Sequence, residues 1–274
     1  MKTALVTGGS SGLGFEMAIQ LAAQGYHVII VAREAKKLDN AVAAIRNKGY
    51  SAAGYAGDIR NYRDMKQIAE SLGNQPDSLD FLILNAGVVH VRVLSDYEDM
   101  AEMKQDIETN LWGTILSART FTPFLRARSK ILFVSSGFGL VGAPGYSIYC
   151  AAKSGVINFA EALRRELHHK HISVYVACPG DVDTPLYREE CRHMPEWMIS
   201  KRERWASVLS AEEAARRILK KCLGKQFIIT CDVGITAMLM AQKMLPARIA
   251  SFLMDFLLPM PPKDDFGTGS RENE

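Results

Sequence analysis

Short apolar runs alternate with longer stretches of helical periodicity along most of the chain. The runs at 4–7 and 28–32 are almost continuously apolar, as expected of parallel strands that are covered on both faces. The longer stretches repeat their apolar positions every three to four residues, as amphipathic helices do. This pattern predicts seven strands, at residues 4–7, 28–32, 51–55, 81–84, 131–135, 173–177 and 227–230.

The stretches between these strands predict helices, and Ser210 is a candidate N-cap for the last of them. The helices are expected at residues 12–24, 36–48, 62–72, 100–128, 147–169 and 211–223. Strands that alternate with helices imply a doubly wound α/β fold with right-handed crossovers. We therefore predict one Rossmann-type domain over 1–232 with a seven-stranded parallel sheet, an apolar helical extension at 233–258 and a tail without fixed structure at 259–274.

Composition narrows the classes of function. The 274 residues include 33 Lys plus Arg and 30 Asp plus Glu, so the formal net charge is only +3. Such a balance does not favour nucleic acid as a partner. The five cysteines are odd in number and have no paired spacing, which indicates a reducing compartment and no metal site. The first residues lack the apolar region of a signal peptide, so a cytoplasmic location is expected.

A glycine-rich turn joins the first predicted strand to the first helix. Glycines at such a turn let the backbone approach a pyrophosphate, and the helix N-terminus supplies free N–H groups and the positive end of a dipole. The same turn without a ligand is the alternative interpretation. The residues that would hold the cofactor here are Gly8, Ser10, Ser11, Gly12, Leu13 and Gly14.

The end of the second strand distinguishes NAD from NADP. An acidic residue there would bind the ribose 2′-hydroxyl, whereas an arginine would favour the 2′-phosphate. Ala32 occupies the place of the acid, and Arg33 follows it. The sequence therefore predicts NADPH as the cofactor. In the alternative interpretation, Arg33 is a solvated residue at the helix start that pairs with Glu34.

Four residues carry the candidate catalytic chemistry. Tyr149 and Lys153 are four apart on a predicted helix and so share a face. Ser136 lies at the end of a predicted strand, and Asn110 lies in the long helix before it. Reduction of a carbonyl needs a proton donor at the forming alkoxide, a role that suits Tyr149 if the Lys153 ammonium and an oxidised nicotinamide lower its pKa from about 10. Ser136 would orient the carbonyl oxygen by a hydrogen bond.

These motifs together resemble the short-chain dehydrogenase/reductase family in order and spacing, over roughly residues 2–232. The glycine turn reads Thr-Gly-x-x-x-Gly-x-Gly, which is similar to the fingerprint of that family. The resemblance implies that Asn110 holds a water that relays protons to Lys153. It also implies cofactor contacts from Asp58 and Ile59 after the third strand, from Asn85, Ala86 and Gly87 after the fourth, and from Pro179, Gly180, Val182 and Thr184 after the sixth.

Residues 183–209 correspond to the substrate lid of that family. Large apolar side chains in this stretch suggest an apolar substrate, and a helix pair that simply packs on the domain is the alternative. The side chains are Tyr187, Met194, Trp197, Met198 and Trp205.

The chain continues past the last predicted strand into a mostly apolar stretch at 235–258. Its 24 residues exceed the roughly 20 that span a bilayer, but Lys243, Arg248 and Asp255 interrupt it and Pro246 divides it. We therefore expect two short amphipathic helices that lie in a membrane interface. A homo-oligomer interface or a wall of the substrate pocket is the alternative.

The segment 178–185, with Glu189-Glu190 and Met194-Pro195 after it, resembles the 3-ketosphinganine reductases, a group that uses NADPH and has a hydrophobic, membrane-associated C-terminal region. The resemblance implies a long-chain lipid ketone as substrate and, in a eukaryote, attachment to the cytosolic face of the endoplasmic reticulum. The substrate ammonium would need an acidic partner, for which Asp181, Asp183, Glu189 and Glu190 are the candidates.

Three hypotheses therefore remain open. The first is a 3-ketosphinganine reductase. The second is a reductase of another lipophilic carbonyl, such as a steroid, a retinoid or a long-chain 3-oxoacyl compound. The third is a catalytically silent regulator that binds NADPH, which would have no need of the complete catalytic set.

Overall fold

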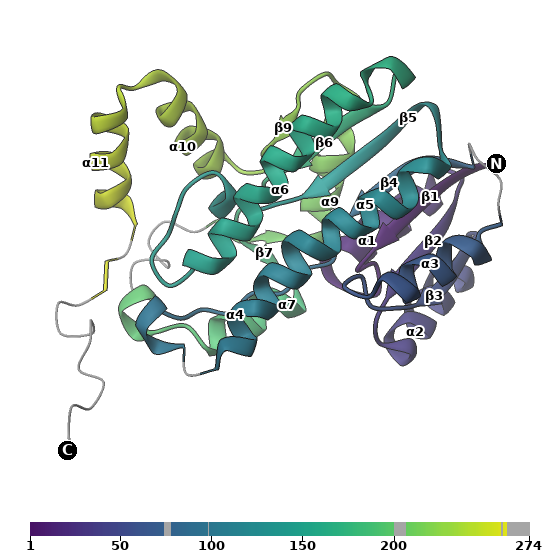
Figure 1. Ribbon diagram of the computed structural model, residues 1–274, viewed down its shortest axis with the longest axis horizontal. Helices are drawn as coiled ribbons and strands as arrows, with labels where there is room; N and C mark the ends of the chain where they lie inside the picture. The colour runs from purple at the N-terminus through teal and green to yellow at the C-terminus, as the bar shows by residue number, and fades with distance from the viewer. Residues whose placement is uncertain (74–77, 98, 200–206, 259, 262–274) are drawn as a thin grey trace.

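The computed structural model describes residues 1–73, 78–97, 99–199, 207–258 and 260–261, and Figure 1 shows a central sheet flanked by helices. The sheet has seven parallel strands in the order β3-β2-β1-β4-β5-β6-β9. This confirms the predicted fold. The strands are β1 Lys2–Thr7, β2 Tyr26–Ala32, β3 Ala52–Ala56, β4 Leu79–Leu84, β5 Leu125–Val134, β6 Ser173–Ala177 and β9 Ile228–Ile229.

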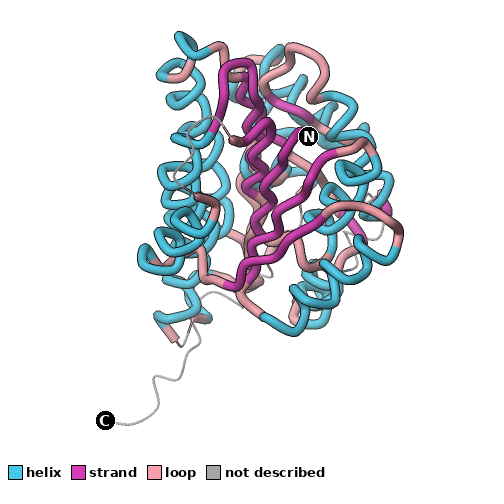
Figure 2. Tube along the Cα trace, turned by 90° about the vertical axis from the view of Figure 1, so that its right-hand side faces the viewer, coloured by secondary structure: helices cyan, strands magenta, loops and turns pink. Residues whose placement is uncertain are grey.

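Helices cover both faces of the sheet, as Figure 2 shows. On one face, α1, α2 and α9 bury side chains such as Met17, Ile45 and Ile218 against the strands. On the other face, α3, α5 and α6 bury Met65, Phe121 and others. These helices are α1 Gly12–Ala23, α2 Ala35–Asn47, α3 Tyr62–Ser71, α5 Gly113–Phe121, α6 Ser147–Glu166 and α9 Ala211–Lys221.

The single helix predicted at 100–128 is wrong. The structure has α4 at Met100–Ile107, a π-helical turn at Glu108–Trp112 and then α5, which ends at Phe121. A short 3₁₀ turn that contains Pro123 follows, and β5 begins at Leu125. Proline cannot continue a helix because it lacks the N–H group. The apolar residues beyond it therefore belong to the start of a strand.

The stretch 183–209 is anchored at both ends by a short parallel pair that the sequence did not predict. Strand β7, Val182–Asp183, pairs with β8, Leu209–Ser210, and the Leu209 N–H donates to the Asp181 carbonyl at 3.0 Å. Helix α7, Pro185–Arg192, follows β7 and is capped by the Thr184 hydroxyl. Trp205 lies outside the described residues.

The C-terminal extension forms two helices, α10 at Val233–Met244 and α11 at Ala247–Leu257, which contact each other. Pro246 separates them, as its position in the apolar stretch predicted. They stand at one side of the molecule, away from the sheet (Figure 1). In the described part of the chain, every helix is too short or too polar to cross a bilayer. The predicted tail at 259–274 lies outside the described residues except for Met260 and Pro261.

Candidate active site

A cavity of about 470 Å³ opens at the carboxyl ends of the parallel strands. The order in which the chain adds strands to the sheet reverses between β1 and β4, and the crevice at such a switch point is where doubly wound sheets bind ligands. Every residue predicted to bind the cofactor or to act in catalysis lines this cavity except Gly14. The lining includes Gly8, Ser10, Ser11, Gly12, Leu13, Arg33, Asp58, Ile59, Asn85, Ala86, Gly87, Asn110, Ser136, Tyr149, Lys153, Pro179, Gly180, Val182 and Thr184.

The glycine turn has a backbone that only glycine adopts without strain. Gly8 has a φ of +67°, and a β-carbon there would lie 2.7 Å from the Cα of Ala86. Ser11, the N-cap of α1, makes no capping hydrogen bond with its side chain. The N-cap side chain therefore leaves the first N–H groups of α1 open, beside a cavity that Gly12 and Leu13 line, as a phosphate site requires.

Gly14 has a packing role instead of a binding role. A β-carbon there would lie 2.4 Å from the Gly8 carbonyl oxygen and 2.4 Å from the Asn85 amide nitrogen. Asn85 itself donates to the carbonyls of Thr7 and Gly8, at 3.3 and 3.2 Å. Asn85 thus holds the glycine turn against the end of β4, and Gly14 leaves the space that this contact needs.

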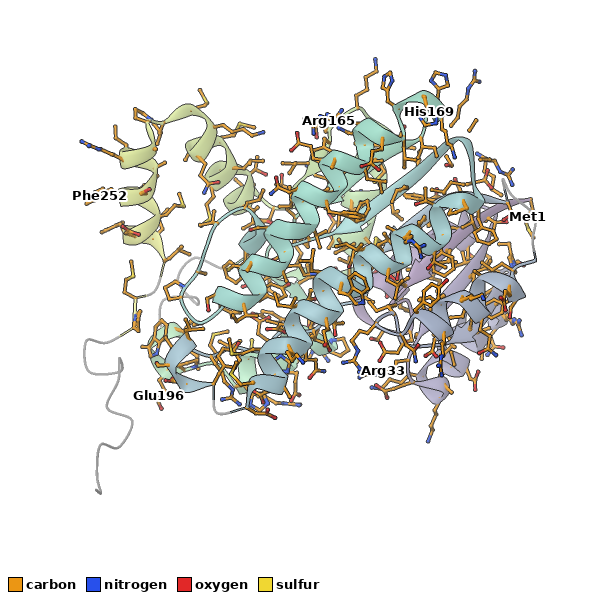
Figure 3. The ribbon with its side chains drawn as sticks, in the orientation of Figure 1. Met1, Arg33, Arg165, His169, Glu196 and Phe252 are labelled. Carbon is orange, nitrogen blue, oxygen red and sulfur yellow. The ribbon has the colours of Figure 1, made fainter. Side chains whose placement is uncertain are left out.

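The end of the cavity beside β2 and β3 is rich in guanidinium groups. Arg33 lines it and is exposed, and Figure 3 places its side chain at this edge of the sheet. Glu34 pairs with Lys37 at 2.9 Å, so among the described residues it is not the partner of Arg33. Arg60, which the sequence analysis missed, also lines this end.

Arg60 changes the expected role of Asp58. Its guanidinium binds the Asp58 carboxylate with a shortest distance of 2.6 Å, and this contact holds the pKa of Asp58 below its usual range. The Asp58 N–H in turn donates to Asp64 at 2.9 Å. The Asp58 carbonyl accepts from the Asn61 N–H at 2.9 Å. The side chain of Asp58 and both of its main-chain polar groups are therefore already engaged within the protein.

Tyr149, Lys153 and Ser136 meet at the centre of the cavity. The Lys153 ammonium lies 5.6 Å from the centroid of the Tyr149 ring, and the Ser136 hydroxyl favours a lower pKa for Tyr149. Lys153 is only 4% exposed and donates to the Val134 carbonyl at 3.1 Å. Ser135, which precedes Ser136, donates instead to the Lys153 carbonyl at 2.9 Å and fixes α6 on the sheet.

Burial shifts the pKa values of the two ionisable groups in opposite directions. It lowers the pKa of Lys153 to about 8, because an ammonium is costly to bury. It raises the pKa of Tyr149, and the negative charge of Glu190 raises it further. From the sequence we expected a lowered pKa for Tyr149. The protein alone does not lower this pKa, and it keeps the phenol protonated.

Asn110 lies in the π-helical turn and is fully buried. Its amide group pairs with the backbone of Val88, accepting from the N–H at 3.1 Å and donating to the carbonyl at 2.8 Å. A water held by Asn110 would therefore bind its main-chain carbonyl, which already accepts from the Thr114 hydroxyl at 2.7 Å. The side chain itself fixes the loop after β4.

A buried acid lies one helical turn before Asn110. Asp106 is 0% exposed, and one of its oxygens lies 2.9 Å from His90 Nδ1, while its Oδ2 has no hydrogen-bond partner among the described residues. Its negative charge raises the pKa of Lys153 against the effect of burial. Asp106 therefore helps to keep Lys153 charged. In the sequence, the spacing of four residues between Asp106 and Asn110 was the feature that could have pointed to this acid.

The start of α10 forms a wall of the cavity. Asp232 caps α10 and also accepts from the Gly180 N–H at 3.1 Å, which ties the extension to the loop after β6. Ile235 packs on Gly137, where a β-carbon would lie 2.4 Å from its Cδ1 atom. Ile235 and Met238 both line the cavity. The pocket-wall interpretation of the extension thus holds for α10.

The lid contributes apolar side chains to the same space. Met198 and Tyr187 line the cavity, and Met194 and Met198 are buried in a cluster with Val91 and Tyr146. The part of the cavity between Tyr149 and these residues is therefore mostly apolar.

Residues 2–195 match the short chain dehydrogenase family, and the chain belongs to this family of oxidoreductases. The chain is 30% identical over 233 residues to the 11-beta-hydroxysteroid dehydrogenase-like protein 4A of Arabidopsis thaliana, an alignment that covers 83% of this chain and 75% of that protein. It is 33% identical over 202 residues to the 3-oxoacyl-[acyl-carrier-protein] reductase FabG of Staphylococcus aureus, covering 73% and 82% of the two chains.

The fold is shared over nearly the whole length with a solved structure. A short chain dehydrogenase/reductase from Burkholderia phymatum, crystallised in complex with NAD, superposes with a TM-score of 0.78 over 95% of this chain and 97% of that one, at 21% identity. Since this coverage exceeds the family match, the likeness in fold extends past residue 195.

Proposed function

We propose that this protein is an NADPH-dependent reductase of a lipophilic ketone, and that the ketone is 3-ketosphinganine. The observation that carries the proposal is the meeting of Ser136, Tyr149 and Lys153 in one cavity with the glycine turn at one end and apolar walls at the other. The three side chains and the glycine turn support the reaction, and the apolar walls support the kind of substrate.

The cavity suits a nicotinamide dinucleotide. The glycine turn leaves room for a pyrophosphate, and the start of α1 offers uncapped N–H groups. Arg33 and Arg60 at the far end would favour a 2′-phosphate, which supports NADPH over NADH. When bound, the cofactor supplies the hydride.

The chain's own residues manage the proton. Tyr149 is held protonated by burial and gives its proton to the oxygen of the ketone. Ser136 donates a hydrogen bond that fixes this oxygen. Lys153, in the next turn of α6, brings a positive charge that compensates the phenolate as it forms, and Asp106 favours the charged form of Lys153.

Two observations support a long-chain substrate on a membrane. The lid and α10 give the cavity apolar walls, and each methylene buried there contributes about 0.8 kcal/mol. Next to the cavity, α10 and α11 expose several large apolar side chains to solvent, and Phe252 points away from the body of the molecule (Figure 3). The exposed set is Val233, Met240, Met244, Leu245, Ile249, Phe252 and Phe256.

The similarity to an 11-beta-hydroxysteroid dehydrogenase-like protein and to a 3-oxoacyl reductase supports a second candidate, another apolar ketone. The deciding experiment follows NADPH oxidation with 3-ketosphinganine, a steroid ketone, retinal and a 3-oxoacyl thioester. The proposal expects the highest kcat/KM with 3-ketosphinganine. Turnover of another compound with none of 3-ketosphinganine would overturn the proposed substrate and leave carbonyl reduction intact.

A further inference from the structure

The catalytic groups face the cavity, where bound ligands would separate them from bulk water. Tyr149 and Lys153 both line the cavity, and Lys153 is only 4% exposed. Each reduction consumes one proton, which Tyr149 gives to the ketone oxygen. This proton is replaced from solvent before the next turnover. A path that avoids the cavity can restore it while ligands are still bound.

The relay through Asn110 that the family resemblance implies has no solvent end of its own. Asn110 is 0% exposed, and its side-chain amide pairs with the backbone of Val88. Its main-chain carbonyl accepts from the Thr114 hydroxyl at 2.7 Å. A path to solvent on this side of Lys153 therefore has to continue through other groups.

His90 and Asp106 form a pair that runs from the surface into the interior. The Nδ1 atom of His90 lies 2.9 Å from Oδ1 of Asp106, and the two side chains are 26% and 0% exposed. Neither residue lines the cavity. Asp106 is on α4, which packs against α6, the helix that carries Lys153. The pair therefore offers a route toward α6 that does not cross the cavity.

Asp106 has the properties of a group that passes protons on. Its Oδ2 is buried and has no hydrogen-bond partner in the described part of the chain, and such an oxygen suits an ordered water. Burial raises the pKa of Asp106, which brings the acid closer to the range in which it can take up and release a proton. Beside the effects of burial, the charge of Asp106 raises the pKa of Lys153 and that of Tyr149. The acid thus acts on both catalytic groups.

Two other titratable groups face this pair from the start of α4. Burial raises the pKa of Tyr97 to about 12, and the charges of Asp106 and Glu102 contribute to this shift. Glu102 binds Arg92 at 2.8 Å, and this contact lowers the pKa of Glu102, with a smaller effect from His90. Neither Tyr97 nor Glu102 changes its charge near neutral pH. An imidazole can take up a proton on one nitrogen and release one from the other, which makes His90 the suitable entry point.

We propose that His90 and Asp106 are the solvent end of the proton path that recharges Lys153 and Tyr149. The inference rests on the proposed reductase function and holds for any ketone that the cavity accepts. His90 takes a proton from solvent and passes one from Nδ1 to Oδ1 of Asp106, which releases one from Oδ2 to a water that bridges to Lys153. Lys153 returns a proton to the Tyr149 phenolate. One proton thus enters for each ketone reduced, and every group regains its starting charge.

The test follows NADPH oxidation with the ketone that wild type reduces best among those named above. His90→Gln keeps an N–H donor for Asp106 but cannot take up a proton. It should lower kcat about tenfold, less than the roughly 10²–10⁴-fold effect of losing a group at the reacting atoms. KM for both substrates should stay at its wild-type value, because His90 lies outside the cavity. The solvent deuterium isotope effect on kcat should rise as proton supply becomes limiting.

Chemical rescue separates a proton path from a structural contact. His90 is partly exposed, so a small molecule can reach the position that His90→Ala vacates. Added imidazole should restore much of kcat, whereas pyrazole, a ring of the same size that hardly binds protons at neutral pH, should not. Asp106→Asn should lower kcat in the same way and respond to neither compound.

A matched control changes a histidine at the other end of the sheet. The Nδ1 atom of His27 lies 2.7 Å from the Ser51 hydroxyl, near the amino end of β2. The cavity opens at the carboxyl ends of the strands, so His27→Ala should keep the wild-type kcat and show no response to imidazole.

Three results would count against the proton path. One is an unchanged kcat in His90→Ala and Asp106→Asn. The second is full turnover by His90→Gln, which would mean that Asp106 needs only a hydrogen-bond donor. The third is equal rescue by imidazole and pyrazole, which would mean that the ring only fills space.

The variants also cover a failure to fold. Because His90→Gln keeps a donor beside Asp106, it decides the question if thermal unfolding shows that His90→Ala or Asp106→Asn is not folded. Wild type that reduces none of the ketones would overturn the proposed function itself. Normal turnover by wild type and by His90→Gln would overturn the proton path alone, so the two failures are distinguishable.

Discussion

Tyr149 is protonated at rest because burial and the charge of Glu190 both raise its pKa, which suits a proton donor. Tyr149→Phe removes only the hydroxyl and keeps the ring against Tyr146. Turnover should fall by roughly 10²–10⁴-fold, the usual contribution of a general acid. NADPH binding, followed by cofactor fluorescence, should persist. Purified Tyr149→Phe with near-normal turnover would contradict the assignment.

Arg33 lines the cavity and is exposed, and its neighbour Glu34 pairs with Lys37. Arg33→Ala should weaken NADPH binding by roughly 1.5–3 kcal/mol, because a charge-assisted contact to the 2′-phosphate is lost. NADH binding should hardly change. Isothermal titration of both cofactors measures the difference, with Lys37→Ala as the control for general loss of positive charge. Equal losses for the two cofactors would refute the role of Arg33.

Asp106 provides a test by pH. Burial raises the pKa of Asp106 above the ordinary value of 3.8 in the folded state, so the folded chain releases this proton at a higher pH than the unfolded chain does. The contribution of Asp106 to the free energy of unfolding is therefore largest at pH values below its pKa in the unfolded chain. This contribution is lost as the pH rises through its higher pKa in the folded state. Each tenfold change in proton affinity corresponds to about 1.4 kcal/mol.

Asp106→Asn should remove this part of the pH dependence. In urea unfolding at a series of pH values from 3.5 upward, the wild type should lose stability relative to the variant as the pH rises. Asp39→Asn, at an exposed position of α2, is the control. A stability difference between wild type and Asp106→Asn that is constant with pH would contradict the burial argument.

Residue types at the cavity were predictable because catalysis and phosphate binding each demand a particular chemistry at a particular spacing. Ser136, Tyr149 and Lys153 lie together as their spacing predicted. The pair of His90 and Asp106 was not predicted, because its two members come from separate elements and each alone looks like a solvated polar residue. Only the folded chain shows that Asp106 is buried.

At the scale of elements, strands were easier to predict than the breaks between helices. All seven strands lie where apolar runs placed them, since parallel strands buried on both faces are continuously apolar. The helix from 100 to 128 was overextended, because residues up to 121 keep a helical period through the π turn at 108–112. The pairing of β7 with β8 had no signal, since two-residue strands carry no pattern.

The exposed face of α11 provides a test at this scale. Phe252 and Phe256, four residues apart, are 74% and 72% exposed, whereas Ala250 and Met254 face inward. Phe252→Ser with Phe256→Ser should reduce binding to liposomes at least tenfold, since burial of each ring contributes about 1.5–3 kcal/mol. Co-sedimentation measures it.

The control for that experiment is an equally exposed apolar residue elsewhere. Leu223, after α9, is 77% exposed, so Leu223→Ser changes an exposed apolar residue that belongs to neither C-terminal helix. It should leave liposome binding unchanged. Wild type that ignores liposomes would argue instead for a protein partner, such as a second copy, on α11.

At the scale of the whole molecule, the C-terminal helices join the cavity to the exposed apolar surface. Ile235 and Met238 on α10 line the cavity, while Met240 and Met244 on the same helix are exposed. Deleting the extension would therefore open the cavity as well as remove the surface. A deletion therefore cannot separate the role of these helices as a wall of the cavity from their role as an exposed apolar surface. Substitutions of the exposed side chains alone can separate them.

This arrangement predicts that the exposed side chains of α11 affect kcat/KM only when the substrate is in a membrane. With a long-chain amino ketone presented in vesicles, Phe252→Ser with Phe256→Ser should lower kcat/KM about tenfold, in step with the lost binding to the surface. With a short-chain, water-soluble analogue in buffer, kcat/KM should stay within about twofold of wild type, because both rings lie outside the cavity. Equal losses for the two substrates would mean that α11 acts on the fold of the cavity and would count against delivery from the membrane.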